Sequence, residues 1–334
     1  MADNIIKSDK SYLLNGPGGV GKSSLIKDIQ RRLTEQGKKY ISLAPTNLAA
    51  LIINGMTIHR FATKLRKQSY IQNMDIEYIF IDEISMVREV FYKFLLMIKK
   101  MKPNIKFIVS GDFNQLAPIA DRISSSTDYS NSPALFELCN SNKINLTICR
   151  RADKQFFDKI SFNNIPQLKP TDFKTTNIYN TKVHLSFTNN KRKEVNEIMM
   201  KQLWDKRGRN GLLIPALPHD KMSQDVRLNL TTPVISKINS KEIGIVNNER
   251  FVISEMSKLN KNMTMTNEQG KKLIIKNNEF QKLFRVSYCT TIHSVQGMSI
   301  GENYTLHEWQ KYDQKLKYVA LSRARSNNLI KVFV

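Results

Sequence analysis

Apolar residues in this chain fall into short runs, and each run is followed by a polar or glycine-rich turn. In the first part of the chain these runs are YLLN (12–15), IEYIFI (76–81) and IKFIVS (105–110). After the first run and a glycine-rich turn comes SLIKDIQRRL (24–33), which reads as a helix. Short apolar runs bounded by turn residues are typical of buried strands in a parallel sheet. The pattern therefore predicts an α/β domain.

The second half of the chain begins with another strand and helix pattern, at 183–203. Before it comes a stretch with two prolines and few apolar positions, ISFNNIPQLKPTDFKTTN (160–177), which is predicted to be a linker. Many short strand-like runs broken by Gly, Pro and Asn follow, before strand character resumes with FRVSYCTTIHS. We therefore expect two α/β domains with a small β-rich insert in the second. The expected bounds are 1–175 for the first domain, with a short insert at about 62–75, then 176–205 together with 286–334 for the second domain, and 206–285 for the β-rich insert.

The turn after the first run, GPGGVGKS, matches G-x-x-x-x-G-K-[ST]. A strand, a glycine loop and a helix in that order point backbone N–H groups and a helix N-terminus at one phosphate. Lys22 would reach the β- and γ-phosphates, and the Ser23 hydroxyl would bind Mg²⁺. A glycine turn with a surface lysine is the alternative, which the strand and helix context disfavours. The expected nucleotide-binding residues are Gly16, Pro17, Gly18, Gly19, Val20, Gly21, Lys22, Ser23 and Ser24.

The other two runs end in polar residues suited to hydrolysis. Asp82 is expected to hold Mg²⁺ through water, and Glu83 to polarise the attacking water. The two acids could instead simply cap the next helix, because acids favour helix starts. Gln115, after the third run, could sense the γ-phosphate. Together with the phosphate loop, the two acids favour a nucleotide hydrolase.

Charge suggests what the hydrolase acts on. The 334 residues include 52 Lys and Arg against 29 Asp and Glu, a formal net charge of +23, which favours a polyanion such as nucleic acid. The three cysteines have no CxxC spacing, so neither a disulfide framework nor a zinc site is indicated. No signal-peptide pattern or apolar membrane span is visible, so we expect a soluble, intracellular protein.

The ordered motifs resemble superfamily 1 helicases, and most closely the Pif/RecD-like branch, superfamily 1B. Further similar segments are LAPTNLAA (43–50), TIHRF (57–61), LTICRR (146–151), TIHSVQG (291–297) and YVALSRAR (318–325). One such motif would be weak evidence, but the series covers nearly the whole chain. The resemblance implies two RecA-like P-loop domains in tandem, an SH3-like insert in the second, and ATP hydrolysed with Mg²⁺ between the domains.

The resemblance also implies roles for individual residues. Arg150 and Arg323 would be arginine fingers that reach the phosphates from the far side of the cleft, with Arg151 and Arg325 as nearby rivals, and Gly297 would help to bind the nucleotide. Phe113 could stack on a base or fill the core. The remaining nucleic-acid contacts would be Pro45, Thr46, Asn47, Thr57, His59 and Phe61 in the first domain, and Thr291, His293 and Gln296 in the second.

Two departures from the family pattern affect what is expected. No glutamine precedes Gly16, although relatives use one there to read adenine, so the selectivity for adenine is in doubt. The segment at about 62–75, where many relatives carry a hairpin that splits duplexes, is short. Weak unassisted unwinding is therefore expected.

The sequence therefore predicts an ATP-dependent DNA helicase that moves on single-stranded DNA, with 5′ to 3′ direction implied only by the branch it resembles. Its expected partners are single-stranded DNA, duplex junctions and replication or repair proteins, and it would act as a monomer. An RNA helicase of the same superfamily, a nucleic-acid clamp that does not separate strands, and a nucleoside kinase are the alternatives. The kinase is the weakest, because it would need neither the charge nor the two arginines.

Overall fold

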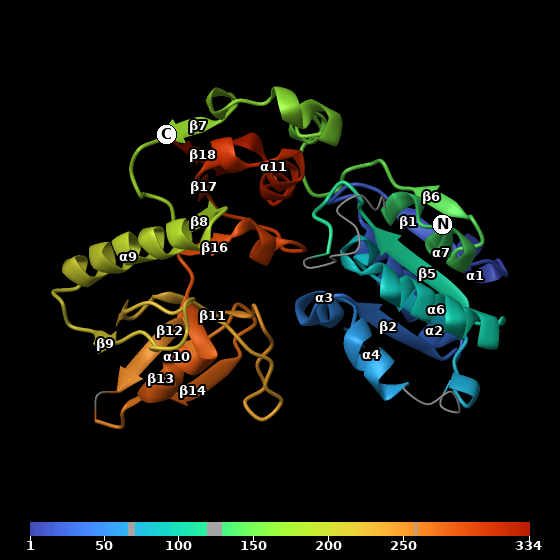
Figure 1. Cartoon of the computed structure of the whole chain (residues 1–334), viewed down its shortest axis with the longest axis horizontal. Helices are drawn as coiled ribbons and strands as arrows, with labels where there is room; N and C mark the ends of the chain where they lie inside the picture. The colour runs from blue at the N-terminus through green and yellow to red at the C-terminus, as the bar shows by residue number, and fades with distance from the viewer. Residues whose placement is uncertain (66–70, 119–128, 258) are drawn as a thin grey trace. The chain divides into compact units, whose positions relative to one another are not determined.

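The computed structural model describes residues 1–65, 71–118, 129–257 and 259–334. It divides into two compact units, Met1–Phe162 and Asn163–Val334. Each unit is described by itself below, and Figure 1 labels the helices and strands of both.

Unit 1 is built on a parallel sheet in which the predicted apolar runs are central strands. The strand order is β3-β2-β4-β5-β1-β6, and every pair is parallel. The carboxyl ends of all strands therefore meet at one edge, where ligands bind in open α/β sheets. The bounds are β1 Tyr12–Asn15, β2 Tyr40–Ala44, β3 Met56–Thr57, β4 Tyr78–Ile81, β5 Lys106–Gly111 and β6 Lys143–Asn145.

Helices cover both faces of this sheet, because successive strand residues point to opposite sides. Leu13, Ile79 and Ile81 belong to one core cluster, whereas Leu14 and Phe80 belong to another. Central strands that are apolar on both faces give the α/β layers predicted for the first domain. The helices are α1 Ala2–Lys7, α2 Lys22–Glu35, α3 Asn47–Ile52, α4 Ile58–Lys64, α6 Glu89–Met101, α7 Pro133–Leu138 and α8 Lys154–Lys159, with short 3₁₀ turns at Ile84–Met86 and Tyr129–Asn131.

Unit 2 carries a second parallel sheet, ordered β16-β8-β17-β18-β7. Its strands are β7 Lys174–Thr176, β8 Val183–Ser186, β16 Cys289–Thr291, β17 Tyr304–Leu306 and β18 Ile330–Phe333. Its longer helices are α9 Asn189–Lys206 and α11 Gln314–Leu321. Two short 3₁₀ turns precede β7, at Phe162–Gln167 and Pro170–Asp172. Three more lie between the later elements, at Ile292–Val295, Trp309–Lys311 and Asn327–Leu329. The tandem of two RecA-like domains is thus confirmed.

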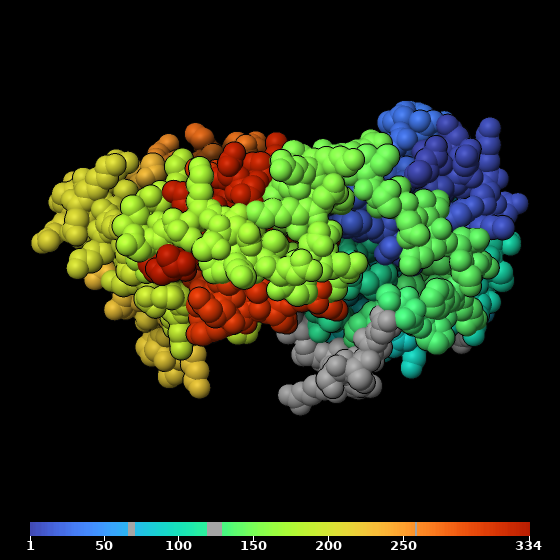
Figure 2. Space-filling model, turned by 90° about the horizontal axis from the view of Figure 1, so that it is seen from above, coloured from blue at the N-terminus to red at the C-terminus, as the bar shows by residue number. Residues whose placement is uncertain are grey.

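The boundary between the units lies before the predicted one. Residues 163–175, expected at the end of the first domain, belong to unit 2, because β7 pairs with β18 and the Val334 N–H donates to the Thr176 carbonyl at 3.0 Å. Phe173 also packs against Trp309, with ring centroids 5.6 Å apart. Figure 2 shows yellow-green atoms of this part of the chain beside red atoms of the C-terminal part. The segment predicted to be a linker is therefore partly an edge strand.

The predicted β-rich insert is confirmed as an antiparallel sheet inside unit 2, in the order β14-β13-β12-β11-β15. Its core contains the aromatic rings of Phe251, Phe280 and Phe284. The elements are β11 Pro233–Ser236, β12 Arg250–Ser257, β13 Asn262–Thr266, β14 Lys272–Lys276, a 3₁₀ turn at Asn277–Glu279, α10 Phe280–Leu283 and β15 Phe284–Val286. A separate hairpin, β9 Leu212–Ile214 with β10 Val226–Leu228, precedes it.

The short insert predicted at about 62–75 falls partly outside the described residues, because 66–70 are not among them. The helix that precedes residues 66–70, α4, ends at Lys64. Within the described parts of the chain, no helix has the length and apolar character needed to cross a bilayer.

Two buried histidines pair in the core of unit 2. His184 Nε2 lies 3.0 Å from the Thr181 carbonyl, and His184 Nδ1 lies 3.0 Å from His307 Nε2. A carbonyl can only accept, so the His184 Nε2–H donates to it, and the His307 Nε2–H donates to His184 Nδ1. Burial lowers the pKa of His184 to about 4 and that of His307 to about 3, where His184 and Lys191 lower it further and Glu308 opposes them. Both imidazoles are therefore neutral near pH 7.

This pair predicts a loss of stability in mild acid. In the unfolded chain the two imidazoles take up protons as the pH falls below about 6.5, whereas in the folded protein they stay neutral until about pH 4. In that window each imidazole therefore lowers the free energy of unfolding by up to about 1.4 kcal/mol per pH unit. We expect the thermal midpoint to fall more steeply between pH 6.5 and 4 than that of a His307→Gln variant, as measured by circular dichroism. Equal slopes for the two proteins would contradict the assigned neutral pair.

Candidate nucleotide and nucleic-acid sites

The glycine loop 16–21 links the end of β1 to the start of α2. Gly21 is the N-cap of α2 and has φ 90°, a backbone conformation that side chains rarely adopt. At Gly16, a Cβ atom would lie 2.3 Å from the Leu146 carbonyl oxygen, so no larger residue fits. The sequence therefore forms a tight loop whose backbone leads into a helix N-terminus, which suits an anionic group.

Lys22 is the first residue of α2 and is only 7% exposed. Its ammonium donates to the carbonyl oxygens of Gly16 at 2.7 Å and Pro17 at 2.9 Å. A buried ammonium held by two loop carbonyls is a fixed positive charge inside the loop. This arrangement fits the phosphate-binding role predicted from the motif.

Ser23, the next residue, contacts the predicted metal-binding carboxylate. Its hydroxyl donates to Asp82 Oδ2 at 2.6 Å, while Asp82 Oδ1 accepts from the Glu83 N–H at 3.0 Å and from the Ser110 hydroxyl. Asp82 follows β4 and is 3% exposed. A hydroxyl and a carboxylate in contact form the oxygen donor set that Mg²⁺ prefers, so these residues fit that ion. The sequence analysis missed Ser110, and its place directly before Gly111-Asp112 is the signal that could have found it.

Glu83 and Gln115 follow the neighbouring strands β4 and β5. Glu83 has φ 54°, and non-glycine residues in the left-handed region cluster at functional sites. The Gln115 amide nitrogen donates to Asp112 Oδ2 at 3.1 Å, and no partner of its buried Oε1 was found in the described structure. Both side chains therefore belong to the same sheet edge as Asp82, as the sequence analysis expected.

Arg150 does not come from the other domain, and that prediction is wrong. It lies in unit 1, where its N–H donates to the Gly19 carbonyl at 2.9 Å. A Cβ atom on Gly21 would lie 3.5 Å from Arg150 Cδ, so the side chain runs beside the phosphate loop. The cause is topological: β6 pairs with β1, and the chain after β6 then returns along the loop. Arg151, its rival, lies against Gly19.

Arg323 is in unit 2 and is 1% exposed at the end of α11. Its guanidinium donates to the carbonyls of Val319 at 2.9 Å and Met298 at 2.9 Å, and to the Ser322 hydroxyl at 2.8 Å. These bonds tie α11 to the segment 291–298, which holds the TIHSVQG motif. Arg325, its rival, is exposed.

The predicted nucleic-acid residues of unit 1 follow β2 and β3 at the same carboxyl edge. Thr46 and Thr57 cap α3 and α4, because their hydroxyl oxygens accept hydrogen bonds from the Ala49 and Arg60 N–H groups. Each hydroxyl therefore already makes one hydrogen bond to its own helix. His59 is exposed and packs edge-on against Phe91. Pro45 and Asn47 flank Thr46 and are half-buried.

Two aromatic residues of the predicted set differ in exposure. Phe61 is 3% exposed and packs against Phe94 in the core, because it lies on the inner face of α4 together with Ile58. Its expected contact with nucleic acid is therefore corrected to a packing role. Phe113 is half-buried against the same core.

In unit 2 the predicted residues follow β16. The Thr291 hydroxyl lies 2.9 Å from the Ser294 hydroxyl, and Gly297 has φ 80°. His293 and Gln296 are half-buried. Burial lowers the pKa of His293, against a smaller opposing effect of Asp313, so its imidazole is neutral at pH 7. The Arg323 guanidinium thus contacts the segment that holds these residues.

Fold and site together define a P-loop ATPase with two RecA-like domains. A family model described as "AAA domain" matches residues 2–121. The ATP-dependent DNA helicase Pif1 of Campylobacter jejuni is 23% identical in an alignment that covers 99% of this chain and 90% of that protein. PIF1 of Emericella nidulans is 27% identical over 50% of this chain, which spans only 26% of that protein.

Solved structures agree on the fold. Pif1 helicase from Bacteroides in complex with ADP-AlF3 and ssDNA has a TM-score of 0.70 at 18% identity, covering 99% of this chain and 90% of that one. Pif1 helicase from Candida albicans has a TM-score of 0.71 at 18% identity, with 99% and 92% covered. The resemblance of the motif series to Pif1-like superfamily 1B helicases is confirmed.

Proposed function

We propose that this protein is an ATP-dependent DNA helicase that moves on single-stranded DNA and unwinds duplexes. The observation that carries the proposal is the cluster at the carboxyl edge of the unit 1 sheet, where Lys22 lies in the loop and Ser23 contacts Asp82. The similar proteins are named DNA helicases, and one was solved with ADP-AlF3 and ssDNA. ATP is thus the nucleotide expected in the loop.

Each residue of the cluster has a distinct task in hydrolysis. Lys22 and the loop N–H groups bind the phosphates, and Ser23 and Asp82 would hold Mg²⁺, which when bound supplies positive charge against the phosphate oxygens. Glu83 accepts a proton from the attacking water. Gln115 senses the γ-phosphate through its amide nitrogen, which carries a second N–H besides the one donated to Asp112 Oδ2.

The two arginines stabilise the charge that develops on the transferred phosphoryl group. Arg150 acts from unit 1, beside Gly19 and Gly21. Arg323 acts from unit 2, where its bonds to Val319 and Met298 link its position to the TIHSVQG segment. Hydrolysis and the hold on DNA are coupled through this link, because the segment that carries Thr291 and His293 is fixed by the same guanidinium.

Single-stranded DNA is held by polar residues that follow the strands, together with the excess of positive charge. A motor on single strands needs phosphate contacts and stacking surfaces but no base-edge readout. The proposed contacts are Pro45, Thr46, Asn47, Thr57, His59 and Phe113 in unit 1, and Thr291, His293 and Gln296 in unit 2.

The affinity for single-stranded DNA is expected to fall steeply with salt. The logarithm of the binding constant should drop by about 0.7 per neutralised phosphate for each decade of salt. We propose that Arg60, an exposed cation in the first turn of α4 next to His59, also contacts a phosphate, so an Arg60→Gln variant should reduce the slope by about this amount. Lys39→Gln is the matched control, since Lys39 pairs with Asp75 before the amino end of β2. Fluorescence anisotropy of a labelled oligonucleotide measures both, and an unchanged slope for Arg60→Gln would place the DNA elsewhere.

Strand displacement tests the helicase function itself. Duplexes with a 5′ tail or a 3′ tail are mixed with protein, ATP and Mg²⁺, and the release of a labelled strand is followed on gels. We expect release from the 5′-tailed duplex, and a slow rate if unwinding is weak. Release from the 3′-tailed duplex alone would overturn the direction, and DNA-stimulated hydrolysis without release from either would favour the clamp.

A comparison of DNA and RNA separates the remaining alternative. ATP hydrolysis is measured with single-stranded DNA and RNA of equal length and sequence. DNA should stimulate hydrolysis more strongly, and stimulation by RNA alone would make the protein an RNA helicase.

A further inference from the structure

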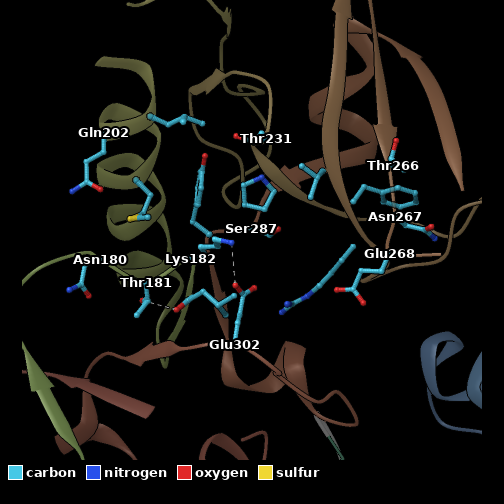
Figure 3. A pocket seen from close by; sticks show the side chains of 18 of the residues that line it. Asn180, Thr181, Lys182, Gln202, Thr231, Thr266, Asn267, Glu268, Ser287 and Glu302 are labelled. Carbon is cyan, nitrogen blue, oxygen red and sulfur yellow. Dashed lines mark hydrogen bonds and ion pairs between the residues drawn. The ribbon is translucent and has the colours of Figure 1, made fainter. Parts of the chain in front are cut away.

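Unit 2 contains a cavity of about 650 Å³ where its parallel sheet meets the β insert. One wall is formed by the residues that precede three parallel strands: Lys182 before β8, Ser287 and Tyr288 before β16, and Glu302 before β17. The opposite wall comes from the insert, with Thr266, Asn267 and Glu268 (Figure 3). The volume lies within the range of small-molecule sites.

An unpaired cation faces this cavity. Arg250, the first residue of β12, lines it, and its Nε and Nη2 atoms are buried without a hydrogen-bond partner in the part of the chain that the structure describes. Burial lowers the pKa of Arg250, and Glu268 and Glu302 partly oppose this effect. Buried guanidinium N–H groups without acceptors are costly, so they mark a place where an acceptor is missing.

The nearby carboxylates do not act as the acceptors for the Arg250 N–H groups. Glu302 lies 3.9 Å from the Lys182 ammonium, and Figure 3 shows these two side chains facing each other from adjacent parts of the wall. Neither Glu302 nor Glu268 makes a hydrogen bond to Arg250 that meets the usual geometry. The Nε and Nη2 atoms form the edge of the guanidinium that binds a carboxylate through two parallel bonds.

Apolar side chains form another part of the lining. Val183, Met199, Leu203, Pro233 and Phe251 supply it from β8, α9 and the insert. A ligand with one anionic end and an apolar body could therefore pair its charge with Arg250 and pack its apolar body against these side chains.

We propose that this cavity binds a compact organic monocarboxylate, whose carboxylate pairs with Arg250 and whose apolar body lies against α9 and the insert. A single negative charge suits the site better than a phosphate dianion, because the lining has three cations, Lys182, Lys206 and Arg250, against two carboxylates, Glu268 and Glu302. The ligand would join the parallel sheet to the insert.

This site is separate from the proposed helicase machinery. The cavity lies at the amino ends of β8, β16 and β17, whereas Thr291 and the TIHSVQG segment follow the carboxyl end of β16. In parallel strands these ends are at opposite edges of the sheet. Binding is therefore expected without ATP or DNA, and its outcome is independent of the helicase assays.

Isothermal titration calorimetry with 3-phenylpropanoate tests the proposal on the full chain without nucleotide. We expect one site per chain, at least about tenfold weaker binding of the neutral 3-phenylpropanamide, and weaker binding of phenyl phosphate. Arg250→Gln should weaken binding of the carboxylate by at least about tenfold, since a buried charge partner is lost. Its thermal midpoint should not fall, because the variant removes a buried cation without a hydrogen-bond partner.

Two further variants keep the test decisive. Arg285→Gln is the matched control, because Arg285 is also an insert arginine with a buried, unpartnered Nε but does not line the cavity, and it should bind as the unaltered protein does. Leu203→Trp keeps Arg250 but fills the apolar part, and it should abolish binding. Equal binding of acid and amide, unchanged binding by Arg250→Gln, tighter binding of phenyl phosphate, or no heat at millimolar acid would each overturn the proposal.

Discussion

Replacing Glu83 by glutamine is expected to lower kcat for DNA-stimulated ATP hydrolysis by about 10²–10⁴ while the affinity for ATP stays nearly unchanged. Glu83 follows Asp82 at the edge of the sheet, and its φ of 54° turns the chain sharply there. Glutamine keeps the size of the side chain and its hydrogen-bonding oxygen but cannot accept a proton at neutral pH. The binding residues Lys22 and Ser23 remain, so only the chemical step should suffer.

Glu89→Gln is the matched control for this change. Glu89 lies six residues further on, at the start of α6, and accepts from the Ser132 hydroxyl at 3.1 Å. Steady-state hydrolysis and equilibrium binding of a fluorescent ATP analogue measure the two effects. If Glu89→Gln lost as much activity as Glu83→Gln, or if Glu83→Gln lost ATP binding in proportion to kcat, Glu83 would not be the base.

The phosphate loop and its acids could be predicted from sequence because the relevant interactions are local or topologically fixed. Gly16 to Ser23 form one turn, and Asp82 and Gln115 each follow an apolar run that becomes a neighbouring strand. Parallel strands must bring their carboxyl ends to one edge, so the order of motifs along the chain was enough to bring these residues together.

Arg150 and Phe61 show where this reasoning fails. The unit to which Arg150 belongs depends on the pairing of β6 with β1, and β6 is a three-residue strand whose apolar signal is weak. Phe61 lies within a motif associated with DNA, but the rotation of α4 directs it inward with Ile58. A helix face is set by packing, which a short motif does not reveal.

The Arg250 cavity was also invisible in the sequence. Its charged lining comes from Lys182, Lys206, Arg250, Glu268 and Glu302, which are far apart along the chain and come from the parallel sheet, α9 and the insert. No spacing rule links them, since they lie in or beside different helices and strands of unit 2. Only the docking of the insert on the sheet brings them together.

Substituting lysine for Arg150 or Arg323 is expected to lower kcat by about 10³–10⁵, the contribution of an arginine that stabilises the transferred phosphoryl group. Lysine keeps the charge but loses the planar fork. The two variants should differ in stability. Arg150 is exposed beside the loop, so Arg150→Lys should leave the thermal midpoint unchanged. Arg323→Lys should lower it, because carbonyls of Val319 and Met298 lose their donors at a cost of about 1–3 kcal/mol.

The rival arginines provide the controls for this prediction. Arg151→Lys and Arg325→Lys change guanidiniums one and two residues away, and both should retain most of the activity. Hydrolysis assays, binding of the ATP analogue and thermal melts are run on all four variants. Arg323 is buried and makes its hydrogen bonds inside its own unit, whereas Arg325 is exposed. If activity were lost only in Arg325→Lys, Arg325 would be the arginine that stabilises the phosphoryl group. Arg323 would then only fix the TIHSVQG segment.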